Sequence, residues 1–246
     1  MNAPVYFISD VHLALANHEQ EQQRRNRLFR LFDTVRESGG TLYILGDFFD
    51  FWFEYRHVIP RYYFDVLANL QALVTAGIRV EFILGNHDFW TRDFLTGVLG
   101  IRVHRQAVEV TIKGKRIWLT HGDGLLKGER GYRFMRRIIR SRPFVFLFRW
   151  LHPDLGVAFA SRISATNRGN HDRREKWAEV RFAELLEVAE NRWNAGLDTV
   201  IMGHYHLNRL YTTPEGKQLL CLGDWISHFT YGKIADDGLT LEVWPE

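Results

Sequence analysis

Residues 80–88 have the sequence VEFILGNHD, from which both the fold and the site can be inferred. Its mainly apolar first half has the composition of a buried strand, and Gly85 marks the point at which the chain turns. The turn then presents an amide, an imidazole and a carboxylate, from Asn86, His87 and Asp88. Taken alone, polar residues after a strand are ordinary loop chemistry. What the stretch predicts therefore depends on whether other strands end in the same way.

Four other stretches repeat the pattern of an apolar run followed by Asp, His or both. They are Asp10-Val11-His12, Gly46-Asp47-Phe48-Phe49-Asp50, His121-Gly122-Asp123 and Gly203-His204-Tyr205-His206. Each is weak evidence by itself, although Gly-His-x-His is stronger because alternate residues of a strand point to one face. Ligands of α/β sheets bind beyond the carboxyl ends of strands. The five motifs together therefore predict a metal site along the edge where these strands end, which we call the rim.

The apolar segments around the first motifs predict an α/β fold. Strands are expected at residues 5–8, 42–45 and 78–84, with helices over residues 18–37 and from Pro60 to Gly77. This β-α-β-α-β order predicts a parallel sheet with right-handed crossovers. A short helix is expected near residues 91–99.

The rest of the chain has a different pattern. Residues 108–120 predict a hairpin, residues 129–195 predict charged helices, and the later strands predict an antiparallel meander. Those strands are expected at residues 199–202, 207–213, 217–222, 229–234 and 239–243. We therefore expect one domain over residues 1–246, with two facing mixed β-sheets flanked by helices. A helical cap is expected as an insertion at about residues 125–195.

The composition predicts a folded chain with a sizeable core and no disulfide. The 246 residues are 46% hydrophobic and include 18 Phe, 9 Tyr and 8 Trp, while the net charge is only +3. Cys221 is the only cysteine and follows two leucines, which predicts a buried thiol rather than a nucleophile. We expect a soluble protein, because no secretory signal is recognisable and no run approaches the roughly 20 apolar residues of a membrane span.

Seven side chains at the strand ends are candidate metal ligands: Asp10, His12, Asp47, Asn86, His121, His204 and His206. Oxygen and imidazole donors suit divalent Mn, Fe or Zn, and the lack of cysteine ligands argues against a structural zinc site. Seven donors are too many for one tetrahedral ion but suit two ions that share a carboxylate. Two ions about 3.5–4 Å apart can clamp a phosphoryl group and activate a water for in-line attack. Histidines without a motif, His228 among them, are expected to be structural or on the surface.

The order of the five motifs, which spans residues 10–206, resembles the calcineurin-like metallophosphoesterases. The resemblance implies one metal held by Asp10, His12, Asp47 and His206, and a second held by Asp47, Asn86, His121 and His204. The implied catalytic residues are His87, Asn86 and Asp88. In this scheme His87 donates a proton to the phosphate or the leaving group, while Asp88 and Asp50 orient their neighbours. Because metal ions disfavour a protonated imidazole, the alternative is that His87 only hydrogen-bonds the phosphate.

The segment from Lys127 to Arg149 is strongly basic, with eight basic residues and one acidic residue, Glu129. Arginines alternate with apolar residues around positions 133–140, which predicts an amphipathic helix. Such a helix can pack its apolar face on the protein and leave its arginines solvated. Beside a phosphoesterase site it also suits a phosphate-bearing lipid, a membrane headgroup region or nucleic acid.

Finer details resemble the UDP-2,3-diacylglucosamine pyrophosphohydrolases: LGDFFDFW at 45–52, HGDG at 121–124 followed by Gly131-Tyr132-Arg133, and LGDW at 222–225. This family cleaves its substrate to 2,3-diacylglucosamine 1-phosphate and UMP in lipid A synthesis, usually with Mn²⁺. The resemblance implies a cap over the acyl chains and a cytoplasmic protein that can lie peripherally on the inner membrane. It implies neither nucleic acid nor an obligate protein partner. Candidate substrate contacts are Tyr132, Arg162, Asn167 and Arg168. One residue departs from the pattern, since much of the family has Arg where this chain has His87.

Two other functions remain open from the sequence. One is a soluble metallophosphodiesterase or nucleotidase whose cap binds a nucleotide. The other is a metal-binding scaffold without turnover, which predicts lost ligands, whereas all seven candidates are present. An apolar cleft beside the metals favours the acyl-chain substrate, and a polar groove favours the soluble one.

Overall fold

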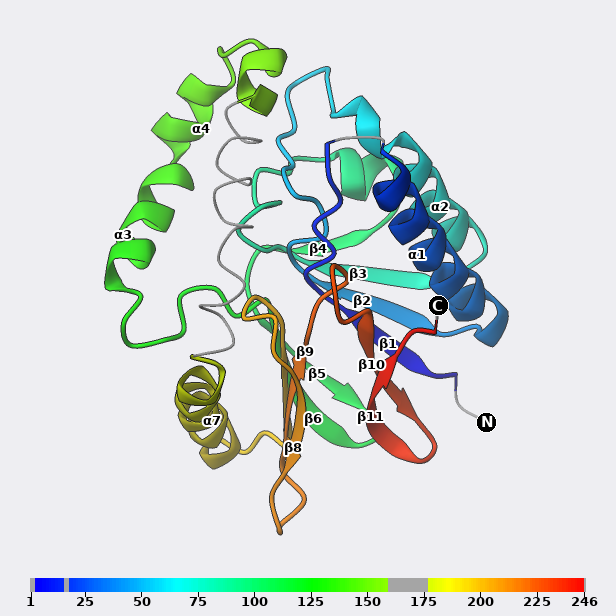
Figure 1. The fold of residues 1–246 in the computed structure, drawn as a ribbon, viewed down its shortest axis with the longest axis vertical. Helices are drawn as coiled ribbons and strands as arrows, with labels where there is room; N and C mark the ends of the chain where they lie inside the picture. Colours follow the sequence, from blue (N-terminus) through cyan, green and yellow to red (C-terminus); the bar gives the residue numbers. More distant parts are fainter. Residues whose placement is uncertain (1–2, 16–17, 159–176, 246) are drawn as a thin grey trace.

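The computed structural model describes residues 3–15, 18–158 and 177–245, and it has two mixed β-sheets that face each other with helices on the outside (Figure 1). The first sheet has the order β11-β10-β1-β2-β3-β4. Its strands are β1 (Val5–Ile8), β2 (Thr41–Leu45), β3 (Arg79–Ile83), β4 (Arg102–His104), β10 (Thr230–Ala235) and β11 (Gly238–Val243). Strands β1 to β4 run parallel, as the β-α-β-α-β pattern predicts.

The second sheet has the order β5-β6-β7-β9-β8. Its strands are β5 (Val108–Ile112), β6 (Lys115–Thr120), β7 (Thr199–Met202), β8 (Asn208–Thr212) and β9 (Gln218–Leu222). The predicted hairpin is the antiparallel pair β5 and β6. The predicted antiparallel meander is wrong, because β6, β7 and β9 are parallel and β10 and β11 join the first sheet. A long connection between β6 and β7 allows the chain to return in the same direction.

Helices cover the outer face of each sheet (Figure 1). The first sheet carries α1 (Glu19–Ser38) and α2 (Phe64–Thr75), which follows the short 3₁₀ turn η1 (Arg61–Tyr63), and the second sheet carries α7 (Ala178–Asn194). The helix expected near residues 91–99 is a single π-helical turn, η2 (Phe94–Val98). The predicted helical segment contains α3 (Arg130–Ile139), α4 (Arg142–Phe148) and α7 among its described residues.

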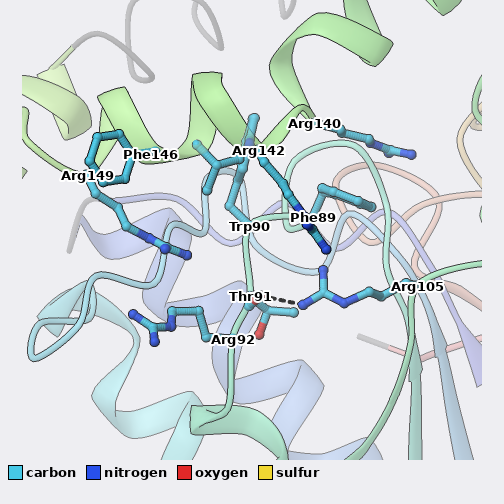
Figure 2. Close-up of a pocket in the computed structure, with 10 residues that line it drawn as sticks. Phe89, Trp90, Thr91, Arg92, Arg105, Arg140, Arg142, Phe146 and Arg149 are labelled. Carbon is cyan, nitrogen blue, oxygen red and sulfur yellow. Dashed lines mark hydrogen bonds between the residues drawn. The ribbon is translucent and has the colours of Figure 1, made fainter.

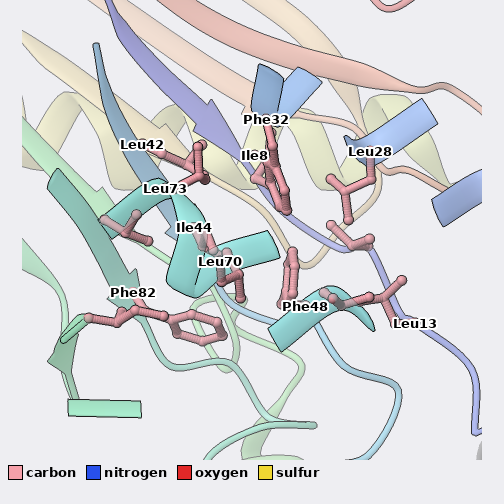
Figure 3. Packing of buried hydrophobic residues seen from close by; sticks show 14 of the residues in the cluster. Ile8, Leu13, Leu28, Phe32, Leu42, Ile44, Phe48, Leu70, Leu73 and Phe82 are labelled. Atoms are coloured by element: carbon pink, nitrogen blue, oxygen red, sulfur yellow. The ribbon is translucent and has the colours of Figure 1, made fainter. Parts of the chain in front are cut away.

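Three apolar layers hold these elements together. Figure 3 shows the layer beneath α1 and α2, which contains Leu28 and Phe32 of α1 together with Ile8 and Ile44 of the sheet. A second layer fills the space between the two sheets, and a third lies between the second sheet and α7. Burying each such side chain stabilises the fold by about 1.5–3 kcal/mol. Cys221 belongs to the third layer and is buried, as predicted.

Helices α3 and α4 differ from the others, because neither has a buried residue. The break between them follows the sequence: Ser141 caps the N-terminus of α4 and Pro143 lies in its first turn. The apolar side of α3 faces solvent, with Phe134 67% and Met135 48% exposed. In the part of the chain that is described, no helix has the length and apolarity to cross a membrane.

Candidate metal centre

The seven predicted metal ligands lie in the loops that follow the carboxyl ends of β1, β2, β3, β6 and β7. Backbone hydrogen bonds hold these loops against one another beyond the sheets. The amide of Asp10 donates to the Gly46 carbonyl at 3.1 Å, and the amide of His12 donates to the Asp47 carbonyl at 2.9 Å. The two sheets meet where the His204 amide donates to Oδ2 of Asp10 at 2.7 Å. The strand ends therefore form one rim.

Two glycines of the motifs are required by how closely these loops approach. A side-chain carbon on Gly85 would lie 2.3 Å from Oδ1 of Asp47, and one on Gly203 would lie 1.7 Å from Oγ of Ser9. Both distances are far below van der Waals contact, so a larger residue would force the strand ends apart.

The backbone of the rim is strained. Seven non-glycine residues of the described chain have a positive φ, and five of them are predicted ligands: Asp10, His12, Asp47, His204 and His206. Such conformations cost on the order of 1–3 kcal/mol each and persist where the surrounding structure holds them for function.

One cluster consists of Asp10, His12 and His206, whose donor atoms all lie within 4.8 Å of one another. Oδ1 of Asp10 is 3.7 Å from Nε2 of His12 and 3.6 Å from Nε2 of His206. Oδ1 of Asp10 and Nε2 of His12 are buried and have no hydrogen-bond partner. Since buried polar atoms are nearly always paired, these two fit a cation that binds both.

A second cluster consists of Asp47, His121 and His204. Nε2 of His121 lies 3.4 Å from Oδ2 of Asp47 and 3.2 Å from Oδ1 of Asn86. Nδ1 of His121 lies 2.8 Å from the Leu45 carbonyl oxygen, which can only accept a hydrogen bond. Nδ1 therefore carries a proton, and Nε2 faces the cluster, where a metal ion can replace its proton.

A third group, His12, Asp47 and His87, joins the two clusters through Asp47. Oδ2 of Asp47 lies 3.8 Å from Nε2 of His12 and 3.9 Å from Nε2 of His87. Nδ1 of His87 lies 2.7 Å from the Asp50 carbonyl oxygen, so Nδ1 carries the proton and Nε2 faces the rim. His87 thus lies beside the carboxylate that both clusters approach.

The rim attracts positive charge. Burial disfavours the charged form of His12 and His121, yet neighbouring carboxylates outweigh it and raise the pKa of each ring to about 10. For His12 these carboxylates are Asp10, Asp50 and Asp47, and for His121 the main one is Asp47. Burial and the His121 cation lower the pKa of His204 to about 4. A divalent cation would take the place of the protons on the first two rings.

Residues beneath the rim orient these donors. Both carboxylate oxygens of Asp88 accept backbone hydrogen bonds, from Gly85 at 2.7 Å and Phe48 at 2.8 Å, so Asp88 ties the Asp47 and Asn86 loops together. Asp224 Oδ2 lies 3.1 Å from Nδ1 of His206 and 2.8 Å from Nδ1 of His228. The prediction assigned no role to Asp224 and no motif to His228. The signal for Asp224 was present, since it follows Gly223 after another apolar run.

Asp123 anchors α3 to the rim. Its Oδ2 accepts hydrogen bonds from Tyr132 at 3.1 Å, Arg136 at 2.8 Å and Arg140 at 3.0 Å. Arg140 also donates to the Gly85 carbonyl at 3.1 Å. The basic side of α3 therefore faces the protein. This places Tyr132 at the rim, with its ring 6.1 Å from that of His204. The other predicted substrate contacts, Arg162, Asn167 and Arg168, lie outside the described residues.

The donor set fits divalent metal ions. It contains carboxylate, amide and imidazole groups and no sulfur, which suits Mn, Fe or Zn. The unpaired atoms of Asp10 and His12 fit the same interpretation. When bound, such ions would polarise a phosphoryl oxygen and lower the pKa of a bound water.

A pocket of about 390 Å³ lies beside this rim, between the segment from Phe89 to Arg92 and helix α4 (Figure 2). The basic side chains that line it are Arg92, Arg105, Arg140, Arg142 and Arg149. The stacked guanidinium of Arg140 lies 4.0 Å from the centre of the Phe89 ring.

The sequence matches the calcineurin-like phosphoesterase family over residues 3–208. The chain belongs to this family and is a hydrolase of the metal-dependent phosphoesterase class. It is 32% identical to a Porphyromonas gingivalis protein named UDP-2,3-diacylglucosamine hydrolase, over 98% of this chain and 97% of that one. A Haemophilus ducreyi protein of the same name is 28% identical, over 89% of this chain and 91% of that one. Among solved structures, an archaeal phosphodiesterase matches at 13% identity and a TM-score of 0.45, over 98% and 99% of the two chains.

Proposed function

We propose that this protein is a dinuclear-metal hydrolase that cleaves the pyrophosphate of UDP-2,3-diacylglucosamine. The products would be 2,3-diacylglucosamine 1-phosphate and UMP, as in lipid A synthesis. The observation that carries the proposal is the pair of donor clusters that meet at Asp47. Full-length similarity to proteins named for this substrate supports the choice of pyrophosphate ester.

The ligand assignment follows the two clusters. We assign Asp10, His12 and His206 to one ion, and His121, His204 and Asn86 to the other. Asp47 would bridge them, because its Oδ2 lies within 3.9 Å of His12, His87 and His121. Mn²⁺ is the proposed metal, since the donors are borderline and hard.

The chain's own residues would orient the ester and handle one proton. Nε2 of His87 faces the rim, from where it can hydrogen-bond a phosphate oxygen or protonate the leaving oxygen. Asp88 would keep the Asn86 and Asp47 loops in register through its two backbone hydrogen bonds. Tyr132 would face the substrate from α3, with Asp123 fixing its hydroxyl.

We further propose that one domain spans the chain and that the insertion at about residues 125–195 is a cap over the substrate. The contacts of Arg136 and Arg140 with Asp123 support a cap that is docked on the rim. Arg162, Asn167 and Arg168 stay proposed contacts to polar groups of the substrate. A location at the cytoplasmic face of the inner membrane follows from the proposed lipid substrate.

One observation favours the second candidate, a soluble metallophosphodiesterase or nucleotidase. The pocket beside the rim is lined by five arginines, Arg92, Arg105, Arg140, Arg142 and Arg149, rather than by aliphatic side chains alone. Guanidinium groups bind phosphate and stack on planar rings, which suits a nucleotide better than an acyl chain.

In the deciding experiment, the purified protein is incubated with Mn²⁺ and, in separate reactions, with UDP-2,3-diacylglucosamine, bis-p-nitrophenyl phosphate or a panel of nucleotides. We expect the lipid-linked substrate to have the highest kcat/KM and to release UMP. Equal or faster cleavage of the simple esters, with no turnover of the lipid, would refute the lipid substrate and leave the soluble hydrolase.

The metal assignment is tested separately with Asn86→Ala and His121→Ala. Each should lose one metal ion per chain, measured by elemental analysis, and nearly all activity. A fully active variant with two ions bound would contradict the two-metal assignment.

A further inference from the structure

The pocket beside α4 has an unusual charge. Its lining contains the five arginines named above and no Asp or Glu. In Figure 2, Arg142 and Arg149 extend from α4 toward Thr91 and Arg92, and Arg105 enters from the opposite side. Five guanidinium groups around one cavity repel each other unless an anion lies among them.

Two acids near the pocket, Glu54 and Asp123, are already engaged. Glu54 accepts four hydrogen bonds, from the Thr91 hydroxyl and from the backbone amides of Arg92, Asp93 and Phe94, at 2.7–3.1 Å. Asp123 binds Arg136 and Arg140. Among the described residues, which are 3–15, 18–158 and 177–245, none forms an ion pair with Arg92, Arg142 or Arg149. Burial and repulsion by Arg92 lower the pKa of Arg149, and the carboxylate of Glu54 only partly opposes this shift.

The pocket also offers aromatic surface. Phe89 lies next to two guanidinium groups, those of Arg140 at 4.0 Å and Arg105 at 5.7 Å from its ring centre. Trp90 and Phe146 complete the apolar part of the lining. A volume of about 390 Å³ is too large for a phosphate ion alone and suits a phosphate joined to a larger group.

We propose that this pocket is a second phosphate-binding site, which holds a phosphate group of a phosphorylated ligand beside the metal centre. Arg140 connects the two sites, since it contacts both the Gly85 carbonyl at the rim and the Phe89 ring in the pocket. The inference goes beyond the proposed function and does not depend on which bond the metal centre cleaves. The phosphate could come from a soluble nucleotide or from a phospholipid headgroup, since Leu147 and Trp150 are exposed on the same segment.

The test compares Mn²⁺-loaded wild type with R92A/R149A, and uses R130A/R137A as the matched control. The control removes the same charge from two exposed arginines of the cap that do not line the pocket. Calorimetric titration with UMP and with inorganic phosphate should show a binding event besides that at the metals. Losing two guanidinium–phosphate contacts should weaken this event about 100-fold in R92A/R149A and leave it unchanged in the control.

A second arm distinguishes the source of the phosphate. It measures co-sedimentation with phosphatidylcholine vesicles that contain or lack phosphatidylglycerol. Loss of UMP binding in R92A/R149A supports a soluble ligand, while a selective loss of binding to the anionic vesicles supports a headgroup. If R92A/R149A matches the control in both arms, the proposal is wrong.

Should R92A/R149A fail to fold by circular dichroism, R142A, which changes an exposed pocket residue, takes its place. Hydrolysis is not the readout, so a failed lipid assay leaves this result intact.

Discussion

At the scale of single residues, the candidate site works by fixing which nitrogen of each imidazole is free. The Leu45 and Asp50 carbonyls accept hydrogen bonds from Nδ1 of His121 and His87, and Asp224 faces Nδ1 of His206. In each case Nε2 is directed to the rim, where a metal ion or a phosphate oxygen can reach it. These partners are two backbone carbonyls and the carboxylate of Asp224, which comes from another loop. They orient the three imidazole rings without being candidate ligands themselves.

The sequence predicted the donors better than their partners. Asp10, Asp47 and His121 could be found because each follows an apolar run that had to be a strand. A backbone carbonyl such as that of Leu45 has no signature in the sequence. The contact of His228 with Asp224 could not be predicted for a related reason, since it depends on the turn between β9 and β10. The local sequence pattern predicts which strand end carries a side chain, whereas the group that the side chain contacts depends on tertiary packing.

His87 gives the residue-scale prediction. His87→Ala should reduce kcat by about 10²–10⁴-fold if the ring donates a proton, and by less if it only hydrogen-bonds the phosphate. Both metal ions should stay bound, because neither assigned ligand set includes His87. Steady-state kinetics with elemental analysis of the same sample measures both quantities.

The control for this variant is His57→Ala, which changes an exposed histidine. It should retain full activity and both ions. Loss of a metal ion from His87→Ala alone would mean that His87 is itself a ligand, which its place in the group with His12 and Asp47 makes chemically feasible.

At the scale of elements, α1 supports the loop after β1 that carries Asp10 and His12. Arg24 donates to the carbonyls of Val11 at 2.7 Å and His12 at 2.8 Å, and Arg25 donates to that of Ala14 at 3.0 Å. Glu21 lies between both guanidinium groups and accepts the Ala14 amide at 3.0 Å. The helix thus holds His12 in its positive-φ conformation from outside the rim.

Arg24→Ala tests this support. Removing charged donors from two loop carbonyls should relax the loop and weaken Mn²⁺ binding by about 10–100-fold. A competition titration against a fluorescent chelator measures the affinity. Arg30→Ala changes an exposed arginine of the same helix and should bind as the wild type does. Equal affinities for the two variants would show that α1 does not position the loop.

Helix α3 shows what an amphipathic pattern leaves open. The alternation of arginine and apolar residues predicted the helix correctly, but the pattern does not say which side faces the protein. Asp123 decides it, because one half-buried carboxylate can satisfy Arg136, Arg140 and Tyr132 together. As a result, Phe134 and Met135 are left exposed.

At the scale of the whole molecule, the rim depends on two sheets that the sequence could only partly place. Helices between strands predicted the parallel order of β1, β2 and β3. The position of β10 beside β1 was not predictable, because it pairs residues more than 220 positions apart, such as Val5 with Ile234. The facing of the sheets is what brings Asp10 of the first within reach of His206 of the second.

This arrangement predicts that metal ions stabilise the whole fold. Asp10 and Asp47 are almost fully buried, and the strained loops that carry them meet at the junction of the sheets. Free metal at 100 times its dissociation constant adds about 2.7 kcal/mol for each site that binds only the folded state. At about 2–4 °C per kcal/mol for a chain of this size, each site should raise Tm by roughly 5–11 °C.

Differential scanning calorimetry with Mn²⁺ and with EDTA measures this shift. Asp47→Ala should lose most of it, because that carboxylate is shared by both sites, and the variant's Tm should hardly respond to EDTA. Asp33→Ala removes an exposed carboxylate from α1 and should keep the full shift. Equal Tm values with and without metal in the wild type, at saturating Mn²⁺, would mean that the donors do not bind the ion preferentially in the folded state.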